Sequence, residues 1–274
     1  MAGRRGRLDA ELVRRQLAPS RTAAQAMILA GEIRVAGLVA PKAASQVTPE
    51  QAIQVDNAEP RFASRGGLKL SGALDDLGVD PAGLTALDAG AAHGGFSDVL
   101  LRRGADHVIA VDVAYGQFAW TLRTDPRVTL LERTNVRTLE SSDLAGVVPS
   151  LIVADLSFIS LAKVLPALAG LCGPEAVMLP MVKPQFEAGP GRVGKGGVVR
   201  DPQVWIQTMT AVTMAAADLG FQLLGAAPSQ APGPAGNIEF FLHLVRGESP
   251  RPSGAALACI STAADSGQDL SARL

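Results

Sequence analysis

Two charged residues at the ends of apolar segments are the first candidates for chemistry in this sequence. Lys183 directly follows the apolar run 176–182, and Asp155 directly follows the apolar run 151–154. Both runs are typical of buried strands, and open α/β sheets place their chemistry at the carboxyl ends of such strands. A lysine at the end of a buried strand is costly unless it is paired or functional, so we favour a functional role over a structural one.

A glycine-rich turn between a strand and a helix is the second candidate. The predicted strand 84–89 is apolar except at Thr85 and Asp88, and a helix is expected over 95–103. Such a turn exposes backbone N–H groups at the positive end of the helix dipole, where an anion or a nucleoside cofactor binds. Alone, the pattern fits a simple tight connection equally well. The next predicted strand ends in Asp112, whose carboxylate is placed to accept both ribose hydroxyls, and this favours a nucleoside-binding half-fold.

The order of acid and glycines in the turn distinguishes between nucleoside cofactors. A dinucleotide fingerprint reads G-x-G-x-x-G, whereas here Asp88 precedes Gly90 and the next glycines are Gly94 and Gly95. This pattern resembles the S-adenosylmethionine-binding motif of class I methyltransferases. Asn135 can offer a donor and an acceptor to an adenine edge, although a plain turn asparagine explains it equally well. The expected cofactor-binding residues are Asp88, Gly90, Ala91, Gly94, Gly95, Phe96, Asp112, Val113, Asn135 and Asp155.

Strands and helices alternate through most of the chain, which indicates an α/β fold with a doubly wound sheet. Helices are expected at 64–77, 95–103, 115–122, 161–171 and 202–219, and strands at 84–89, 107–112, 128–132, 151–155, 176–184, 221–226 and 238–244. Five strand–helix units and a terminal strand pair form the Rossmann-like layout of class I methyltransferases. The tail is rich in Ser, Ala, Gly and Pro, so we expect disorder at 248–254 and at most a weak helix at 255–264.

Composition restricts the classes of protein to which the chain can belong. Its 274 residues suffice for one large and one small domain, and the net charge of −1 excludes a uniformly basic polypeptide. Cys172 and Cys259 lack metal-ligand spacing, which argues against a zinc site or a disulfide scaffold and fits a reducing compartment. No apolar stretch approaches the ~18 residues of a membrane span, and the Arg-rich N-terminus lacks a signal-peptide core. We therefore expect a cytoplasmic protein without a metal ion, a membrane anchor or an obligate protein partner.

Positive charge is concentrated in the first 46 residues, which hold eight Arg or Lys and only three acids. The spacing of apolar residues predicts a helix beginning near Leu8 and a second helix capped by Ser20 and ended by Gly31. A hairpin over 33–39 and a strand at 52–55 follow. Two short helices and a hairpin with arginine near each helix start form a surface suited to phosphate, with a merely solvated charged face as the alternative.

This basic segment resembles a known RNA-binding module. Its segments 7–9, 20–21 and 31–37 are similar to the alpha-L motif shared by a ribosomal small-subunit protein and pseudouridine synthases. The resemblance implies that RNA is held by its shape and phosphates more than by its bases. RNA contacts are expected from Arg5, Arg7, Arg21 and Lys42 in this module and from Arg65, Arg133 and Arg137 outside it.

The segments 64–69, 88–96, 153–159, 182–187 and 236–240 together resemble the TlyA (haemolysin A) family, and the resemblance runs from about residue 4 to 246. Members are S-adenosylmethionine-dependent ribosomal RNA methyltransferases with an FtsJ-type catalytic domain. The resemblance implies methylation of a ribose 2′-hydroxyl of cytidine in 16S and 23S rRNA within the 30S and 50S subunits, which in some actinobacteria confers sensitivity to capreomycin and viomycin. It also implies a catalytic set, which consists here of Lys69, Asp155, Lys183 and Glu239.

One departure from the family lies in the cofactor turn. Members commonly have Ser-Thr where this chain has Ala92-His93. The substitution removes two hydroxyls near the methionine end of the cofactor but keeps the glycines. We therefore expect weaker or altered cofactor contacts rather than loss of cofactor binding.

The implied reaction suits these residue types, because a ribose 2′-hydroxyl is a poor nucleophile whose proton must be removed or whose anion must be stabilised. A lysine is normally charged at neutral pH, but burial and a second nearby lysine favour the neutral amine. We expect Lys183 to take the proton, and Lys69 to favour its neutral form or to orient the hydroxyl. Asp155 and Glu239 then hold the lysines and the ribose in place. In-line positioning supplies most of the remaining catalysis.

Other functional classes fit the sequence less well. A non-enzymatic RNA-binding or ribosome-assembly factor predicts gaps in the catalytic set, and a membrane-lytic protein predicts a membrane segment; neither is found. A small-molecule methyltransferase does not need a basic module. The segment 189–195 nearly matches a P-loop, but Gly196 replaces the Ser or Thr that holds magnesium, so we reject nucleotide hydrolysis and expect a mobile basic lid.

The expected domains follow from these segments. They are an RNA-binding domain at 1–59, a linker at 60–66, a methyltransferase domain at 67–247 and a flexible tail at 248–274.

Overall fold

A computed structural model describes residues 5–15, 17–18, 20–29, 31–40, 42–55, 62–189, 191–233, 235–247 and 253–272 of the chain. The chain divides into two compact units, residues 1–61 and 62–274. The first two residues of the linker expected at 60–66 and most of the segment expected to be disordered at 248–254 lie outside the described residues. Within the described ranges, no helix is long and apolar enough to cross a membrane.

The described part of the N-terminal unit contains two short helices and two small sheets. Its elements are β1 (Gly6–Arg7), α1 (Leu8–Arg14), α2 (Arg21–Leu29), β2 (Ile33–Val35), β3 (Leu38–Val39), β4 (Gln46–Val47) and β5 (Ile53–Val55). The predicted hairpin is confirmed as β2 and β3, and its turn residues Ala36 and Gly37 both have positive φ, as a two-residue hairpin turn requires. The predicted cap is also confirmed, because Ser20 Oγ accepts a hydrogen bond from Ala23 N at 3.1 Å.

The larger unit contains a seven-stranded sheet in the order β11-β12-β10-β9-β6-β7-β8. The strands are β6 (Thr85–Ala89), β7 (His107–Val111), β8 (Val128–Leu131), β9 (Leu151–Ala154), β10 (Val177–Val182), β11 (Phe221–Pro228) and β12 (Phe240–Arg246). Among the described strands of this sheet, β12 runs antiparallel to both of its neighbours, β10 and β11. The other neighbouring pairs are parallel. This order confirms the doubly wound layout expected from the sequence.

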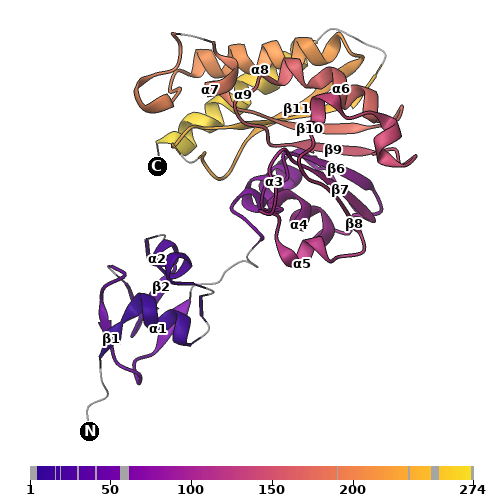
Figure 1. The fold of residues 1–274 in the computed structure, drawn as a ribbon. Helices are drawn as coiled ribbons and strands as arrows, with labels where there is room; N and C mark the ends of the chain where they lie inside the picture. The colour runs from indigo at the N-terminus through magenta and orange to yellow at the C-terminus, as the bar shows by residue number, and fades with distance from the viewer. Residues whose placement is uncertain are drawn as a thin grey trace. The chain divides into compact units, whose positions relative to one another are not determined.

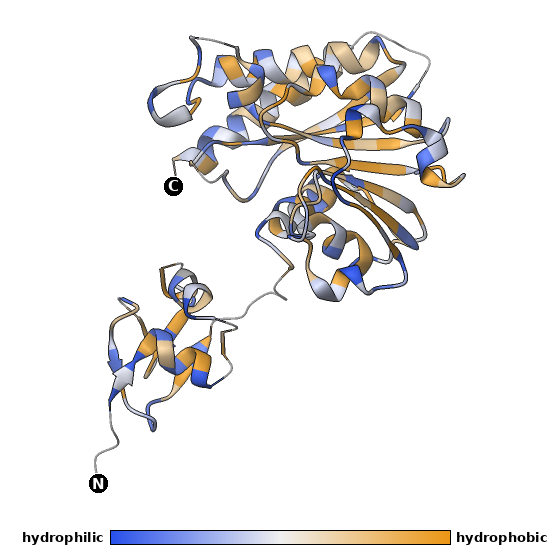
Figure 2. Ribbon diagram, in the orientation of Figure 1, coloured by the Kyte–Doolittle hydropathy of each residue, from blue (hydrophilic) through white to orange (hydrophobic). Residues whose placement is uncertain are grey.

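Helices cover both faces of the sheet (Figure 1). On one face lie α3 (Gly66–Leu77), α4 (Gly95–Arg102) and α5 (Trp120–Arg123), and on the other α6 (Leu165–Leu171), α8 (Pro202–Ala217) and α9 (Gly254–Ser271). Each face has its own cluster of buried aliphatic and aromatic side chains. Figure 2 shows the strands as predominantly hydrophobic, which is typical of a sheet buried on both sides.

Two expected helices are shorter than predicted. The helix expected at 115–122 is reduced to α5, because Gly116 has a positive φ of 75° and Ala119 has extended backbone before Trp120. The helix expected at 161–171 is divided into the 3₁₀ helix η3 (Leu161–Lys163) and α6. The remaining short helices are η1 (Val136–Thr138), η2 (Ser141–Leu144), α7 (Pro184–Glu187) and η4 (Lys195–Gly197).

The tail contains a long helix where at most a weak one was expected. Ser253 Oγ caps α9 by accepting a hydrogen bond from Ala256 N at 3.2 Å. The helix contacts β11 and α8 and buries a stripe of mostly small residues: Ala256, Ile260, Ala263, Ala264 and Gly267. A stripe of alanine and glycine carries a weak hydrophobic signal, which is why its spacing did not predict a packed helix.

The direction of the chain reverses between β6 and β9, which are neighbours in the sheet. From β6 the chain continues outward through β7 and β8, and from β9 it continues in the other direction through β10. The carboxyl ends of strands at such a switch point open a crevice in which ligands of α/β proteins bind. The turn after β6 and the residues after β9 therefore face the same crevice.

Candidate functional site

Two buried ion pairs lie at the carboxyl edge of the sheet. Lys69 Nζ lies 2.5 Å from Glu239 Oε2, and Lys183 Nζ lies 2.5 Å from Asp155 Oδ1. Glu239 is 1% exposed, and even Asp155, the most open of the four side chains, is only 22% exposed. Pairing compensates each charge, and removal of one partner would leave an uncompensated buried charge.

The sheet register brings the two pairs together. Val182 is opposite Phe240 in the antiparallel β10–β12 pair, so the adjoining residues Lys183 and Glu239 are neighbours across the sheet edge. Gln185 connects them further, because its Nε2 donates to Glu239 Oε1 at 3.4 Å. All four residues expected to form a catalytic set thus lie together, although they come from α3 and from the ends of three strands.

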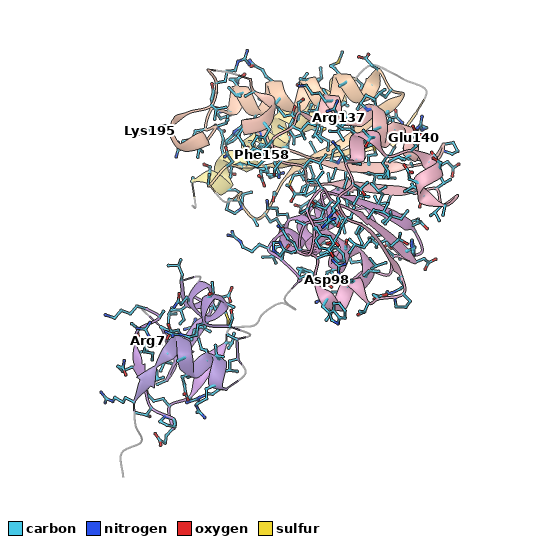
Figure 3. The ribbon with its side chains drawn as sticks, viewed as in Figure 1. Arg7, Asp98, Arg137, Glu140, Phe158 and Lys195 are labelled. Carbon is cyan, nitrogen blue, oxygen red and sulfur yellow. The ribbon has the colours of Figure 1, made fainter. Side chains whose placement is uncertain are left out.

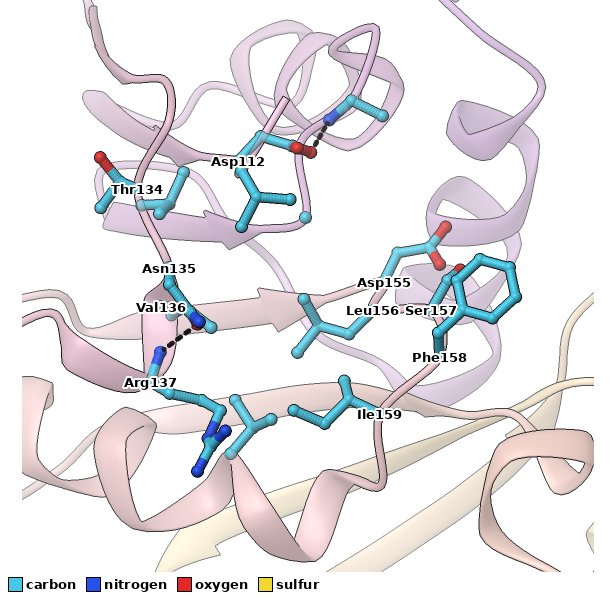
Figure 4. Close-up of a pocket in the computed structure, with 15 residues that line it drawn as sticks. Asp112, Thr134, Asn135, Val136, Arg137, Asp155, Leu156, Ser157, Phe158 and Ile159 are labelled. Atoms are coloured by element: carbon cyan, nitrogen blue, oxygen red, sulfur yellow. Dashed lines mark hydrogen bonds between the residues drawn. The ribbon is translucent and has the colours of Figure 1, made fainter. Parts of the chain in front are cut away.

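A cavity of about 370 Å³ is lined in part by Asp155, the partner of Lys183, and Figure 4 shows the residues around it. Its lining includes the polar side chains of Asp112, Asn135 and Asp155 and the apolar side chains of Leu156, Ile159 and Val164. This volume falls within the range of small-ligand pockets, which are mostly apolar with a few oriented polar groups. The cavity lies at the switch point between β6 and β9, where the sequence places a nucleoside cofactor.

Asp112 is held in place by the backbone around it. Its Oδ2 accepts a hydrogen bond from Ala92 N and its Oδ1 accepts one from Ala114 N, each at 2.7 Å; the first is dashed in Figure 4. A carboxylate has about four acceptor sites, so both oxygens keep capacity for two ribose hydroxyls. Since the contact from Ala92 uses its backbone N–H, the hydroxyl that the family commonly has there is not needed for this interaction.

Only half of the predicted cofactor residues line the cavity. Those that do are Gly90, Asp112, Val113, Asn135 and Asp155, whereas Asp88, Ala91, Gly94, Gly95 and Phe96 do not. A Cβ on Gly90 would lie 2.4 Å from the carbonyl oxygen of Asp155, and one on Gly95 would lie 2.2 Å from Ser64 Oγ. The glycines therefore permit close packing: Gly90 between the turn and the end of β9, and Gly95 between α4 and the start of α3.

Asp88 is buried beneath the turn rather than exposed in the cavity. Its Oδ2 accepts a hydrogen bond from Ser97 Oγ at 2.7 Å, while its Oδ1 has no partner. Burial raises the pKa of this carboxyl to about 7, and the charges of Asp155 and Asp112 add to the effect. The acid of the sequence pattern thus supports the turn from below.

Asn135 serves as a cap as well as a cavity residue. Its Oδ1 accepts a hydrogen bond from Arg137 N at 3.1 Å, dashed in Figure 4, and so begins η1. The turn interpretation of Asn135 is therefore correct. Its amide nitrogen keeps two donors for a ligand, so the cofactor interpretation stays open.

The predicted RNA-contacting residues fall into two groups. Arg7 and Arg21 both donate to the fully buried Asp9, Arg7 through Nε and Nη2 at 3.0 and 2.8 Å and Arg21 through Nη2 at 3.0 Å. These two guanidinium groups are 45% and 57% exposed, so they form a fixed and accessible pair. The other group consists of exposed side chains: Arg5, Lys42, Arg65, Arg133 and Arg137.

The structure adds residues for which the sequence assigned no role. Phe158, labelled in Figure 3, is 90% exposed. Its ring centroid lies 5.0 Å from that of Phe186. Ser157 Oγ accepts a hydrogen bond from Lys183 Nζ at 2.9 Å. Phe158 and Phe186 also line a second, more open hollow that contains Arg137 and Lys163. These aromatic residues lie within segments that resemble the family, but that resemblance gave no clue to which of them would be exposed.

The glycine-rich segment 187–197 is anchored at its far end. Asn237, only 2% exposed, donates from Nδ2 to the carbonyl of Gly197 at 2.9 Å and accepts at Oδ1 from Val199 N at 2.9 Å. Asn237 precedes Glu239 by two residues, so the end of the segment is connected to the strand that carries the catalytic candidate.

Comparisons with known proteins match both units of the chain. The FtsJ-like methyltransferase family model matches residues 62–246, and the S4 domain model matches residues 6–53. The chain is 53% identical to the Mycobacterium tuberculosis 16S/23S rRNA (cytidine-2′-O)-methyltransferase TlyA, covering 88% of this chain and 90% of that protein. It is 34% identical to hemolysin A of Brachyspira hyodysenteriae, covering 87% and 99%. A solved structure of a proposed hemolysin from Streptococcus thermophilus has a TM-score of 0.78 at 34% identity and covers 98% of both chains.

Proposed function

Since the chain belongs to the TlyA family of FtsJ-like methyltransferases with an S4 domain, we propose that it methylates the ribose 2′-hydroxyl of cytidine in 16S and 23S rRNA. The observation that carries this proposal is the pair of buried lysine–carboxylate contacts beside a nucleoside-sized cavity. The proposed substrates are the 30S and 50S ribosomal subunits, which places the reaction in the cytoplasm.

The residues around the cavity fit S-adenosylmethionine. Both oxygens of Asp112 retain capacity for ribose hydroxyls, and the amide nitrogen of Asn135 remains available to an adenine edge. Leu156, Ile159 and Val164 offer the apolar wall that an adenine ring needs. The cofactor supplies an electrophilic methyl group at its sulfonium.

Lys183 is the proposed proton acceptor. In its neutral form its amine takes the proton of the ribose 2′-hydroxyl, and the adjacent carboxylate of Asp155 stabilises the ammonium that results. Ser157 fixes the direction of the lysine side chain through its hydrogen bond. Lys69, compensated by Glu239, orients the hydroxyl and stabilises negative charge that develops on its oxygen.

Exposed groups around this centre suit an RNA substrate. Phe158 offers an open aromatic face on which an unstacked base can lie. Arg137 and Lys163 on the neighbouring hollow can contact phosphates. In the N-terminal unit, the exposed Arg7–Arg21 pair offers a further phosphate-binding surface.

The decisive experiment is methylation of purified 30S and 50S subunits with labelled S-adenosylmethionine, followed by mapping of ribose methylation. We expect label at cytidine 2′-oxygens, and we expect Lys183→Ala to lower the rate by roughly 10²- to 10⁴-fold, the usual contribution of a positioned acid or base. Isothermal titration calorimetry of S-adenosylmethionine with the variant separates a loss of chemistry from a change in cofactor binding, because Asp155 lines the cavity and loses its partner. Label on a base, or wild-type activity of Lys183→Ala, would contradict the proposal.

A further inference from the structure

The segment after β9 is attached to the segment after β10 by the side chains next to the ion pair. Lys183 Nζ donates to Ser157 Oγ at 2.9 Å, and the rings of Phe158 and Phe186 are in contact with centroids 5.0 Å apart. These two contacts hold the first part of the segment 156–160. The same segment contributes Leu156 and Ile159 to the cofactor cavity.

Glu187 holds the second part of the segment. Its Oε2 accepts a hydrogen bond from Ser160 Oγ at 2.7 Å, and its Oε1 accepts one from Leu161 N at 2.8 Å. The carboxylate thus satisfies a backbone N–H at the start of η3, which has no partner within the helix. Glu187, a residue of α7, thereby holds the end of the segment 156–160 in place.

The backbone of this segment needs such support. Phe158 has a φ of +64°, in the left-handed region that a bulky residue rarely adopts, and its ring is 90% exposed. An exposed ring gains little from packing, so contacts of neighbouring residues must maintain the strained conformation. Strained residues of this kind are concentrated at binding and catalytic sites.

The surroundings of Glu187 disfavour its charged carboxylate. No lysine or arginine among the described residues forms an ion pair with it, and its two hydrogen-bond donors are the Ser160 hydroxyl and the Leu161 N–H. Burial raises the pKa of Glu187 above its ordinary value, and these two hydrogen bonds lower it only in part. A carboxylate that merely stabilised the fold would more easily lie at the surface.

We propose that Glu187 is a positioning residue for methyl transfer. Its carboxylate fixes the segment 156–160, so that Phe158 is presented to the RNA while Leu156 and Ile159 line the cofactor cavity. The proposal rests on the proposed function, and Glu187 itself contacts neither the ion pairs nor the cavity.

The test compares Glu187→Ala with Glu187→Gln. We expect Glu187→Ala to lower kcat for rRNA by about 10- to 100-fold, as displacement of a positioned group by about 1 Å does. Glutamine keeps an oxygen that accepts from Leu161 N and an amide that can donate to Ser160 Oγ, so Glu187→Gln should recover activity to within about threefold of wild type. A Glu187→Gln variant as inactive as Glu187→Ala, or a fully active Glu187→Ala, would overturn the proposal.

A double-mutant cycle with Ser160→Ala tests the contact itself. If Glu187 acts through Ser160 and Leu161, Ser160→Ala should cost little activity in the Glu187→Ala background and measurably more in the wild-type background. Additive losses in the two backgrounds would contradict the proposed contact. Thermal unfolding of the four proteins in the cycle accompanies the activity measurement, so that a loss of folded protein is distinguished from a loss of positioning.

A matched control is available at another 3₁₀ helix. Asp143 Oδ2 accepts a hydrogen bond from Glu140 N at 2.9 Å at the exposed start of η2. Asp143→Ala removes a carboxylate–backbone hydrogen bond of the same kind, and it should leave kcat unchanged. If wild-type protein methylates no rRNA, the proposed function has failed. The role of Glu187 is then tested by the affinity for S-adenosylmethionine, and equal affinity of wild type and Glu187→Ala would overturn it.

Discussion

The carboxyl group of Asp88 is buried directly behind the cofactor turn with one oxygen unpartnered. Ser97 satisfies the other oxygen, and among the described residues no lysine or arginine forms an ion pair with this carboxyl. With a pKa of about 7, the group is protonated below neutral pH and loses its proton as the pH rises through the neutral range. At the residue scale, the acid that marks the motif in the sequence is thus a buried carboxyl whose neutral form is favoured far above its ordinary pKa.

A pH dependence of stability follows from this carboxyl. Its pKa is about 7 in the folded protein and 3.8 as an ordinary value, so between these limits the folded state binds more protons than the unfolded state. Stability therefore falls as pH rises through this window, by up to about 1.4 kcal/mol per pH unit. Asp88→Asn cannot ionise, so we expect it to flatten this dependence and to raise Tm above pH 7.

Thermal unfolding from pH 4 to pH 8 checks the expectation. Asp80→Asn, at an exposed carboxyl of the same unit, is the control and should keep the slope of wild type. Parallel pH profiles for wild type and Asp88→Asn would show that Asp88 ionises normally in the folded protein.

At this scale the sequence draws attention to charged residues but does not show their surroundings. Lys183 and Asp155 could be selected because a charge at the end of an apolar strand is conspicuous. The direction in which Asp88 points depends on how α4 packs behind the turn, and the exposure of Phe158 depends on a positive φ that its residue type does not suggest. Neither the direction of the Asp88 side chain nor the exposure of Phe158 follows from the local sequence pattern.

At the scale of the elements, the contact between α3 and α4 depends on Gly95. A Cβ on Gly95 would lie 2.2 Å from Ser64 Oγ and 2.9 Å from the backbone nitrogen of Gly67. The second neighbour is backbone, so the two helices must separate to admit a methyl group. Since α3 carries Lys69 and α4 begins at the cofactor turn, this separation affects both parts of the site.

We predict that Gly95→Ala destabilises the protein by about 1–3 kcal/mol, as overpacking does, and weakens binding of S-adenosylmethionine. Gly170→Ala is the matched control, because nothing lies within 4 Å of its Cβ position in α6. Alanine in a helix should stabilise there by about 0.5–1 kcal/mol. Differential scanning fluorimetry and calorimetric titration of the cofactor measure both effects, and equal Tm shifts for the two variants would contradict the packing argument.

Element prediction succeeded where the hydrophobic signal was strong. The apolar strands and the amphipathic α4 are found within one or two residues of their expected ends. The two-residue strands β1 and β4 are too short to show a period, and α9 presents alanine and glycine where larger side chains would have signalled a buried face. Tertiary contacts determine these elements, and sequence pattern alone does not report them.

At the scale of the whole molecule, the segment that matches the S4 domain and the segment that matches the FtsJ-like methyltransferase belong to separate compact units. Eight basic and three acidic residues fall within positions 1–46, whereas the complete chain has a net charge of −1. Asp9 fixes Arg7 and Arg21 side by side in the N-terminal unit. The excess of positive charge therefore lies within one of the two compact units, the N-terminal one.

This separation predicts independent losses of function. Arg7→Ala/Arg21→Ala should weaken rRNA binding and lower the slope of log affinity against log salt by roughly 1.5, because each lost phosphate contact contributes about 0.7–0.9. Affinity for S-adenosylmethionine should not change. Arg14→Ala, whose guanidinium pairs with Glu11 in the same helix, should have a smaller effect and serves as the control. An unchanged salt slope in the double variant would exclude the pair from the RNA interface.

The close approach of Gly90 to the carbonyl of Asp155 limits how the enzyme can be re-engineered. The floor of the cofactor cavity and the residue that pairs with Lys183 are separated there by a gap too narrow for even a methyl group. A donor analogue with a bulkier transferable group must therefore be accommodated elsewhere. Val113, which is 69% exposed, and Asn135 lie on the open rim of the same cavity, and substitutions at these positions could widen it without moving the reacting centre.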